Sequence, residues 1–236
     1  MMTGYAYVGG ELDLFAAATN WKAYFRSHIQ PYLGNDVLEV GAGLGGTTRL
    51  LCSSCQHRWV CLEPDQALAN RLAQSVRDGT LPATCAVMVG TLERIESQAA
   101  FDTLLYIDVL EHIENDRGEV ARAADCLRPG GHVVVLAPAH GWLYTPFDQA
   151  IGHYRRYTKR SLTALTPDSL ELVRLQYLDS VGLLASLGNR LLLKRAMPNA
   201  KQIAVWDKVL VRLSRIADPL VAHSMGKSVL GVWQKK

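Results

Sequence analysis

Short apolar segments alternate with helical segments through the first two thirds of the chain. Strands that are apolar throughout, with helices between them, are typical of a parallel sheet covered on both faces. The right-handed crossover rule makes such a sheet doubly wound. The expected strands are 36–40, 57–62, 86–89, 101–107 and 133–137, and the expected helices are 47–52, 66–77 and 116–127.

The remaining residues predict a helix before this unit and two further strands after it. The helix covers 11–30 and ends at Pro31, and the strands cover 170–175 and 228–233. We therefore expect an α/β fold, with a doubly wound, mostly parallel seven-stranded sheet of Rossmann-like type and a helical C-terminal insertion.

A single domain is expected over residues 1–236, because no internal repeat or low-complexity linker interrupts the pattern. Within it, residues 1–34 form an N-terminal helical cap and residues 35–140 a cofactor-binding core. Residues 141–236 supply a substrate loop, a helical lid and the last strands.

A glycine-rich turn follows the first expected strand, and such a turn lets a ligand approach the backbone closely. Gly41, Gly43 and Gly46 also satisfy the dinucleotide fingerprint, and Glu63 ends the second strand, where a carboxylate accepts hydrogen bonds from ribose. Glu39 separates the two interpretations. A carboxylate just before the turn repels a pyrophosphate but suits S-adenosylmethionine, which carries an ammonium and a sulfonium group.

Four segments resemble class I S-adenosylmethionine-dependent methyltransferases of the small-molecule, bacterial type. They are Val37-Leu38-Glu39-Val40-Gly41-Ala42-Gly43-Leu44-Gly45, Leu62-Glu63-Pro64-Asp65, Asp108-Val109-Leu110-Glu111-His112-Ile113 and Leu127-Arg128-Pro129-Gly130-Gly131. The resemblance implies that Glu39 and the glycines hold the methionine moiety, Glu63 the ribose, and that Asp108 lies near the sulfonium. Its full cofactor set is Glu39, Gly41, Gly43, Gly45, Glu63, Pro64, Thr91, Leu92, Asp108 and His112.

Two positions within this set have a second interpretation. Thr91 stands where many members of the family have an acidic residue for the adenine amine, so backbone groups could serve there instead. His112 is explained equally well by packing.

The segment after the fifth strand, 138–158, is rich in histidine, arginine and aromatic residues, and long loops on a rigid sheet commonly carry binding and catalysis. His140 and His153 are candidate general bases, with Asp148 as orienting partner. Their alternative is a structural hydrogen bond, and Arg155 and Arg156 could pair with acidic residues of 114–125. The candidate substrate-binding residues are Trp142, Tyr144, Tyr154, Arg155 and Arg156.

The C-terminal insertion is amphipathic and basic. Residues 1–180 carry a net charge of −5 and residues 181–236 one of +8, which indicates either a solvated face of lysine and arginine or an anionic partner or substrate group. We expect a helical lid over the site, and peripheral contact of 183–217 with an anionic membrane is the alternative. The expected packing faces are Leu183, Leu184, Leu187 and Leu191, and Trp206, Val209, Leu210, Leu213 and Ile216, the latter opposite Lys208, Arg212 and Arg215.

Composition narrows the functional class further. No apolar run is long enough to span a bilayer, and no signal peptide is recognised, so we expect a cytoplasmic protein. Cys52 and Cys55 have metal-ligand spacing, but one pair does not define a site, and no metal is expected. No nucleic-acid partner is expected either, because base-stacking aromatics are not interleaved with the basic residues.

These observations predict methyl transfer from S-adenosylmethionine to a small-molecule or lipid- or sugar-linked acceptor, with oxygen as the favoured nucleophile. Three alternatives stay open: a non-catalytic binding protein of the same fold, an NAD-dependent oxidoreductase and a nucleic-acid methyltransferase. The last would be expected to have an Asn/Asp-Pro-Pro-aromatic motif where this chain has Asp108-Val109-Leu110. The oligomeric state is not predicted.

Overall fold

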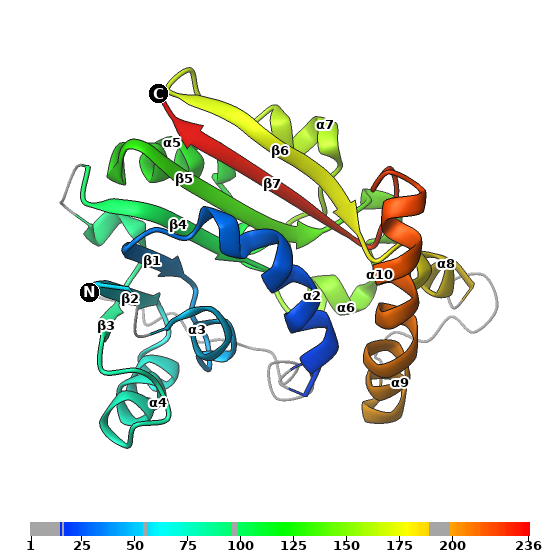
Figure 1. Cartoon of the computed structure of the whole chain (residues 1–236), viewed down its shortest axis with the longest axis horizontal. Coiled ribbons are helices and arrows are strands. Elements are labelled where there is room, and N and C mark those ends of the chain that lie inside the picture. The colour runs from blue at the N-terminus through cyan, green and yellow to red at the C-terminus, as the bar shows by residue number, and fades with distance from the viewer. Residues whose placement is uncertain (1–14, 16, 54–55, 96–98, 189–198) are drawn as a thin grey trace.

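The computed structural model describes residues 15, 17–53, 56–95, 99–188 and 199–236. Seven strands form one sheet in the order β3-β2-β1-β4-β5-β7-β6 (Figure 1). β1 to β5 pair in parallel, and β7 is antiparallel to both of its neighbours. The strands are β1 (Asp36–Val40), β2 (Arg58–Glu63), β3 (Cys85–Val89), β4 (Phe101–Ile107), β5 (Leu127–Pro138), β6 (Leu170–Leu178) and β7 (Ser228–Lys235).

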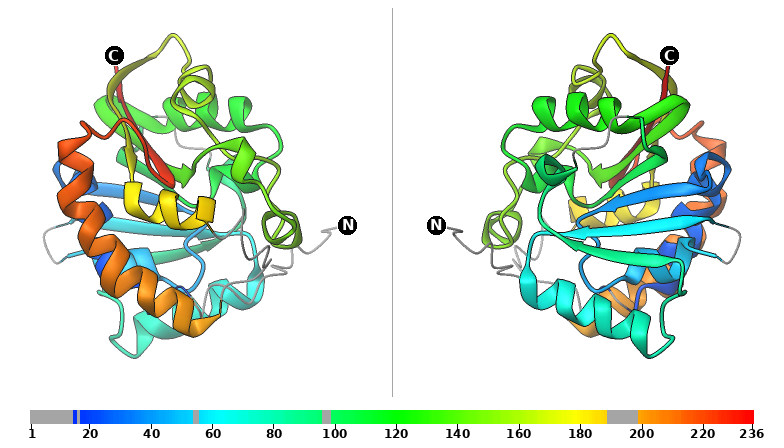
Figure 2. Two further views of the ribbon diagram at one scale, coloured as in Figure 1. Left: turned by 90° about the vertical axis from the view of Figure 1, so that its right-hand side faces the viewer. Right: turned by 90° about the vertical axis from the view of Figure 1, so that its left-hand side faces the viewer.

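Helices cover both faces of the sheet, as the edge-on views of Figure 2 show. One apolar layer packs α5 (Asp116–Cys126) and α7 (Lys159–Thr163) against the sheet, and the other packs α2 (Thr19–Ile29), α3 (Gly46–Leu51), α4 (Gln66–Arg77) and α10 (Val211–Leu220). Adjacent residues of a strand point to opposite faces, so Val37 belongs to the second layer and Leu38 to the first. This two-sided burial explains the uniformly apolar strands.

The predicted fold class is confirmed: the sheet is doubly wound, mostly parallel and seven-stranded, with a helical insertion between β6 and β7. One detail differs. The strand expected at 133–137 starts earlier, because β5 begins at Leu127 and includes residues 128–131, with Gly130 at φ +81°. The start of the predicted cap (1–14) and a part of the predicted lid (189–198) lie outside the described residues.

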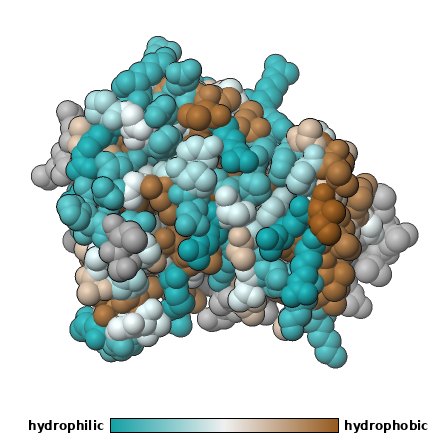
Figure 3. All heavy atoms as spheres, viewed as in Figure 1, coloured by the Kyte–Doolittle hydropathy of each residue, from teal (hydrophilic) through white to brown (hydrophobic). Residues whose placement is uncertain are grey.

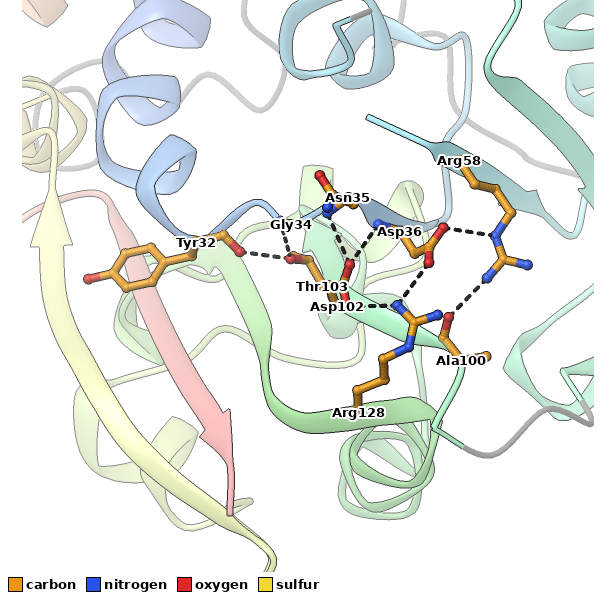
Figure 4. Close-up of polar contacts among 9 residues, drawn as sticks. All are labelled: Tyr32, Gly34, Asn35, Asp36, Arg58, Ala100, Asp102, Thr103 and Arg128. Carbon is orange, nitrogen blue, oxygen red and sulfur yellow. Dashed lines mark hydrogen bonds and ion pairs between the residues drawn. The ribbon is translucent and has the colours of Figure 1, made fainter. Parts of the chain in front are cut away.

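Charged side chains join the amino-terminal ends of the strands, at the edge opposite their carboxyl ends (Figure 4). Arg128 contacts the carboxylates of Asp36 and Asp102 at 2.8 and 2.7 Å, and Asp102 also accepts the backbone N–H groups of Asn35 and Asp36. Arg58 donates to the carbonyl of Ala100. The network ties β1, β2, β4 and β5 together where no ligand has to enter.

The insertion consists of α8 (Ser180–Gly188), α9 (Ala200–Val205), a π-helical turn (Trp206–Leu210) and α10. The expected packing faces are wrong for most of these residues. Val209, Leu213 and Ile216 are 49, 49 and 68% exposed, whereas Asp207 and Ser214 on the opposite side are buried. Trp206 and Leu210 do point inward. Leu183 is buried as expected, Leu184 and Leu187 are exposed, and Leu191 lies outside the described residues.

The buried side of α10 carries two polar residues beside Val211, and they hydrogen-bond the start of α8 and the helix α2. The Asp218 carboxylate accepts the Tyr24 hydroxyl at 2.7 Å and the backbone N–H groups of Asp179 and Ser180 at 2.7 and 2.9 Å. The Ser214 hydroxyl donates to Asp179 at 2.7 Å. Charged acceptors of this kind make strong hydrogen bonds, so polar contacts position the insertion.

Asp218→Ala should lower the free energy of unfolding by roughly 2–5 kcal/mol, because it leaves buried donors without an acceptor. The measurement is chemical denaturation followed by circular dichroism. Leu220→Ala is the matched control on the same helix: its side chain is 82% exposed, and we expect a change within about 0.5 kcal/mol. Equal effects of the two substitutions would contradict a polar anchor.

Candidate active site

A cavity of about 1440 Å³ lies at the carboxyl ends of β1, β2, β3, β4 and β5. Open parallel sheets bind ligands at this edge, near the point where strand order reverses. The helices α2 and α8, the π-helical turn and residues 143–156 form its other walls. The space is large enough for a nucleoside-sized ligand and a second molecule beside it.

The glycine turn after β1 has backbone conformations that favour glycine. Gly41 and Gly45 have φ of +66 and +72°. A Cβ atom on Gly41 would lie 2.7 Å from Val109, and one on Gly45 would lie 2.8 Å from Leu72. Gly41 and Gly43 line the cavity, whereas Gly45 does not: it precedes α3 and packs away from the ligand space.

Glu63 lies at the end of β2, on the cavity wall and almost fully buried. Its two carboxylate oxygens accept the backbone N–H groups of Gly43 at 2.8 Å and of Asp65 at 2.9 Å. Burial raises the pKa of Glu63, and these two donors oppose the rise. Each carboxylate oxygen can accept a second hydrogen bond, so a diol in the cavity would find two positioned acceptors.

Three further residues of the predicted cofactor set line the same part of the cavity: Pro64, Thr91 and Leu92. An acidic residue that the sequence pattern did not single out, Glu93, lies beside them. Its carboxylate is 3.6 Å from Arg122 and its side chain is 70% exposed. An amine at this end of the cavity therefore has a carboxylate within the lining.

Glu39 does not line the cavity, contrary to expectation. Its position in β1 directs the side chain toward the face covered by α3, where its carboxylate accepts the Thr48 hydroxyl at 2.6 Å and the Trp59 indole N–H at 2.8 Å. The side chain is 2% exposed, and burial raises its pKa to about 7. Direct contact between Glu39 and a bound ligand is not supported, and its contacts instead hold α3 against the sheet.

Asp108 provides the negative charge that was expected from Glu39. It follows β4 with φ of +54°, in the left-handed region, and its exposed side chain lines the cavity. Loss of hydration raises its pKa to about 6, opposed by the charges of His153, Lys227 and Arg156. A non-glycine residue at positive φ is strained, and such residues gather at functional sites.

Residues 145–156 are held by one buried carboxylate, that of Asp148, which is 1% exposed. It accepts the Nδ1 of His153 at 3.0 Å, two nitrogens of Arg156 at 2.8 and 3.0 Å, and the hydroxyl of Thr145 at 2.8 Å. Burial alone would raise the pKa of Asp148, but these donors lower it below its usual range. The structure thus brings His153, Asp148 and Arg156 together at the cavity wall.

Two further titratable groups face His153. His112 packs edge-on against it with ring centroids 4.5 Å apart and hydrogen-bonds the backbone of Gly152; burial lowers its pKa to about 4. Glu111 is fully buried, and its Oε1 lies 3.8 Å from Nε2 of His153. Burial, with the charge of Asp108, raises the pKa of Glu111 well above its usual value.

His140 lies outside the cavity, which contradicts its expected catalytic role. Its Nε2 contacts the carbonyl of Gly226 at 3.0 Å, and its ring lies against Trp142 and Tyr177. Trp142 is 47% exposed and is not part of the cavity lining either. The chain turns at His140, which has φ of +64°, and this turn directs the ring away from the ligand space.

Of the remaining predicted substrate residues, some line the cavity and others lie outside it. Tyr144 lines the cavity and donates to the carbonyl of His153 at 2.6 Å. Tyr154 is 54% exposed on the surface. Arg155 is not in the cavity lining, because it forms an ion pair with Asp116 and donates to the carbonyl of Glu114, as the alternative interpretation had it.

Several cavity residues were not singled out in the sequence. Glu111 lies three residues after Asp108, and the turn Leu110–His112 brings both into the cavity. Lys227 comes from the segment before β7, and its ammonium lies 4.9 Å from the Trp206 ring, while burial lowers its pKa. Lys22 and Phe25 come from α2. Glu111 lies within the segment 108–113 quoted above, whereas only tertiary packing places the two lysines and Phe25, so no local motif marks these three.

Comparison with known families identifies the part of the chain that forms this site. Residues 38–133 match a family model described as a methyltransferase domain. This range contains the glycine turn, Glu63, Thr91, Asp108, Glu111 and His112. A comparison with curated proteins found no match.

Solved structures with the same fold cover nearly the whole chain. Geranyl diphosphate methyltransferase in complex with S-adenosylmethionine has a TM-score of 0.66 at 13% identity, covering 97% of this chain and 92% of that one. A protein described as a sarcosine dimethylglycine methyltransferase from Galdieria sulphuraria has 0.61 at 16%, covering 92 and 85%. The [4+2]-cyclase SpnF has 0.64 at 15%, covering 97 and 94%.

Identities this low show a common fold and leave the acceptor open. The family match, the sheet order and the cavity at the carboxyl ends of the strands agree with the resemblance found in the sequence. Residues 38–133 thus match a methyltransferase domain, and the chain has the fold of S-adenosylmethionine-dependent methyltransferases.

Proposed function

We propose that the enzyme transfers the methyl group of S-adenosylmethionine to a hydroxyl oxygen of a small-molecule or lipid- or sugar-linked acceptor. The observation that carries the proposal is the imidazole of His153, which lines the cavity and has its Nδ1 fixed by Asp148 at 3.0 Å. An oxygen nucleophile has to lose a proton, and an oriented imidazole beside the acceptor can take it. Nitrogen nucleophiles need no such group once they are neutral.

The cofactor's orientation follows from the charges of the lining. Its ribose hydroxyls would donate to Glu63, and its adenine would lie toward Pro64, Thr91 and Leu92. Its methionine portion would then lie along the glycine turn toward Asp108. This orientation places the sulfonium methyl between the glycine turn and the histidine side of the cavity.

Methyl transfer is an in-line displacement. Nε2 of His153 would take the proton of the acceptor hydroxyl, and S-adenosylmethionine, when bound, would supply the methyl group from its sulfonium and leave as a thioether. Tyr144 and Arg156 hold the histidine segment in place, so they support the pair without meeting the methyl group.

The outer part of the cavity is apolar, which favours an acceptor with a hydrophobic portion. Its lining includes Phe25, Leu143, Phe147, Ile203 and Trp206. Arg156 is paired with Asp148 and Arg155 with Asp116, so neither is the anion clamp that the sequence suggested. An anionic group on the acceptor would instead meet Lys227.

Glu63→Gln should weaken binding of S-adenosylmethionine by roughly 10- to 100-fold, because hydrogen bonds to a charged acceptor contribute about 1.5–3 kcal/mol. Isothermal titration calorimetry gives the dissociation constant. The buried Glu39 provides the comparison: Glu39→Gln should change it by less than about threefold. A larger loss for Glu39→Gln than for Glu63→Gln would reverse our assignment of the two carboxylates.

With methyl-labelled S-adenosylmethionine and pairs of apolar acceptors that differ only in carrying a hydroxyl or an amine, label should enter the hydroxyl member. His153→Gln should lower this transfer by about 100-fold or more while cofactor affinity stays unchanged. His57→Gln, exposed at the opposite edge of the sheet, is the matched control. Transfer to the amine members alone, unaffected by His153→Gln, would show that oxygen is not the acceptor.

We also infer that α9 and α10 contact an anionic membrane surface. Apolar side chains form a band along these helices (Figure 3), made up of Val205, Val209, Leu213, Ile216 and Leu220. Exposed cations flank this band: Lys201, Lys208, Arg212 and Arg215. No helix among the described residues has the length and hydropathy to cross a bilayer, so the contact would be peripheral.

The protein should sediment with vesicles of phosphatidylcholine containing phosphatidylserine and not with vesicles of phosphatidylcholine alone. The double variant Leu213→Ser/Ile216→Ser should lose this binding, because it removes the apolar area that the protein would bury in the membrane. Val173→Ser, on the exposed side of β6, is the control and should bind like the parent protein. Binding that the double variant retains would exclude this face.

A further inference from the structure

Glu111 is a buried carboxylate that lacks a partner. It is 0% exposed, and neither of its oxygens has a hydrogen-bond partner, although it lines the cavity. Buried carboxylates are normally paired, hydrogen-bonded or bound to a metal ion, because an isolated charge is costly inside a protein. The contacts of the neighbouring residues indicate which of these applies.

Two histidines converge on this carboxylate. One ligand atom from each of Glu111, His112 and His153 lies within 4.8 Å of the others, and the His153 Nε2 to Glu111 Oε1 distance is 3.8 Å. Ligand atoms around one ion at about 2.1 Å are roughly 3–3.6 Å apart. Side-chain adjustments of about 1 Å or less would therefore close the three groups around an ion.

The groups behind the two imidazoles are those that usually support metal ligands. A metal-binding histidine commonly donates its other ring nitrogen to a carboxylate or a backbone carbonyl. His153 has its Nδ1 3.0 Å from Asp148, and His112 hydrogen-bonds the backbone of Gly152. Both rings are thus oriented by partners that lie away from Glu111.

The backbone holds the two contributing segments in register. The N–H of Tyr154 donates to the carbonyl of Glu111 at 2.8 Å, next to His153. The hydroxyl of Tyr157 donates to the carbonyl of Leu110 at 3.2 Å and to Asp116 at 2.8 Å. The cluster is therefore built by two fixed segments, and its ligands do not depend on a loose surface loop.

We propose that Glu111, His112 and His153 bind one divalent transition-metal ion at the acceptor side of the cavity. Two imidazoles and one carboxylate suit Zn²⁺, Co²⁺, Mn²⁺ or Fe²⁺ better than Mg²⁺ or Ca²⁺, which prefer oxygen ligands. Three protein ligands leave a position toward the cavity, as in catalytic sites. The nearby carboxylate of Asp108 adds negative charge. The carboxylate of Asp148 offsets the positive charge of Arg156.

The inference deepens the proposed function and rests on it for the role of the ion. An acceptor hydroxyl bound at the open position would be acidified by the ion and release its proton to solvent. The resulting oxygen anion would then attack the sulfonium methyl group. His153 Nε2 would hold the ion and no longer receive the proton, so metal binding and base catalysis are alternatives for one nitrogen.

The experiment uses Co²⁺ added to the full-length protein after chelator treatment. Calorimetry and visible absorption should show one bound equivalent, with d–d bands and without the charge-transfer band of a cobalt–thiolate bond. Glu111→Gln and His153→Gln should each weaken binding by about 10-fold or more, since each removes a ligand atom. Glu111→Gln should leave the thermal unfolding midpoint of the metal-free protein unchanged or raised, because it replaces a buried carboxyl group whose oxygens have no hydrogen-bond partner.

Two controls separate this site from others. His57→Gln tests an exposed histidine, and Cys85→Ser tests the thiols, since the sulfurs of Cys52 and Cys85 are 3.6 Å apart and could bind the probe; both should bind Co²⁺ like the parent protein. Absence of Co²⁺ binding, its retention in both cluster variants, or its loss in Cys85→Ser would overturn the proposal.

Co²⁺ binding and methyl transfer to a hydroxyl, measured in the same proteins, keep the two proposals apart. Co²⁺ bound by a protein that transfers no methyl group to a hydroxyl would leave the metal site standing and remove the proposed O-methylation. Methyl transfer to a hydroxyl without any bound ion would remove the metal site and leave the proposed O-methylation standing, with His153 as the base.

Discussion

The acceptor side of the cavity depends on the buried carboxylate of Asp148. Residues 141–157 contribute few apolar side chains to the core, so a polar centre has to fix them, and Asp148 does so by binding His153, Arg156 and Thr145 at once. A buried charge is stable only when such partners surround it. The same contacts set the orientation of the His153 ring, and with it any chemistry at Nε2. Structure and function therefore depend on one group here.

The insertion follows a similar rule, and this explains why its amphipathic pattern is misleading. An apolar stripe normally marks the buried face of a helix. In α10 the buried positions carry Val211 and two polar residues, Ser214 and Asp218, which satisfy donors of α2 and α8, while most of the apolar stripe faces outward. The hydrophobic pattern specifies that a helix forms, whereas hydrogen-bond partners from distant segments decide which face turns inward. An apolar face left on the surface is then a candidate contact site, here for a membrane.

The sheet and the cofactor half of the site could be predicted from local sequence. Buried parallel strands are apolar throughout, and the glycine turn and Glu63 occupy positions that the strand ends determine. The acceptor half could not be predicted to the same degree. His140 and His153 look alike in sequence, but a left-handed residue directs one ring outward, and Asp148 directs the other inward. Glu111, Lys227 and Lys22 come from separate segments, so only the folded chain assembles them.

The electrostatic argument for a cationic cofactor still holds, but residues other than Glu39 supply the negative charge. Glu39 was expected to repel a diphosphate, but its carboxylate is enclosed beneath the glycine turn, with its negative charge directed at Thr48 and Trp59. Glu63, Asp108 and Glu111 do line the cavity, around the same turn. A pyrophosphate there would meet the carboxylates of Glu63 and Asp108 in a medium of reduced dielectric constant, whereas an ammonium and a sulfonium are attracted to them. The selection of a cationic ligand is thus a property of the strand ends as a group, and it does not depend on the single residue that the motif emphasises.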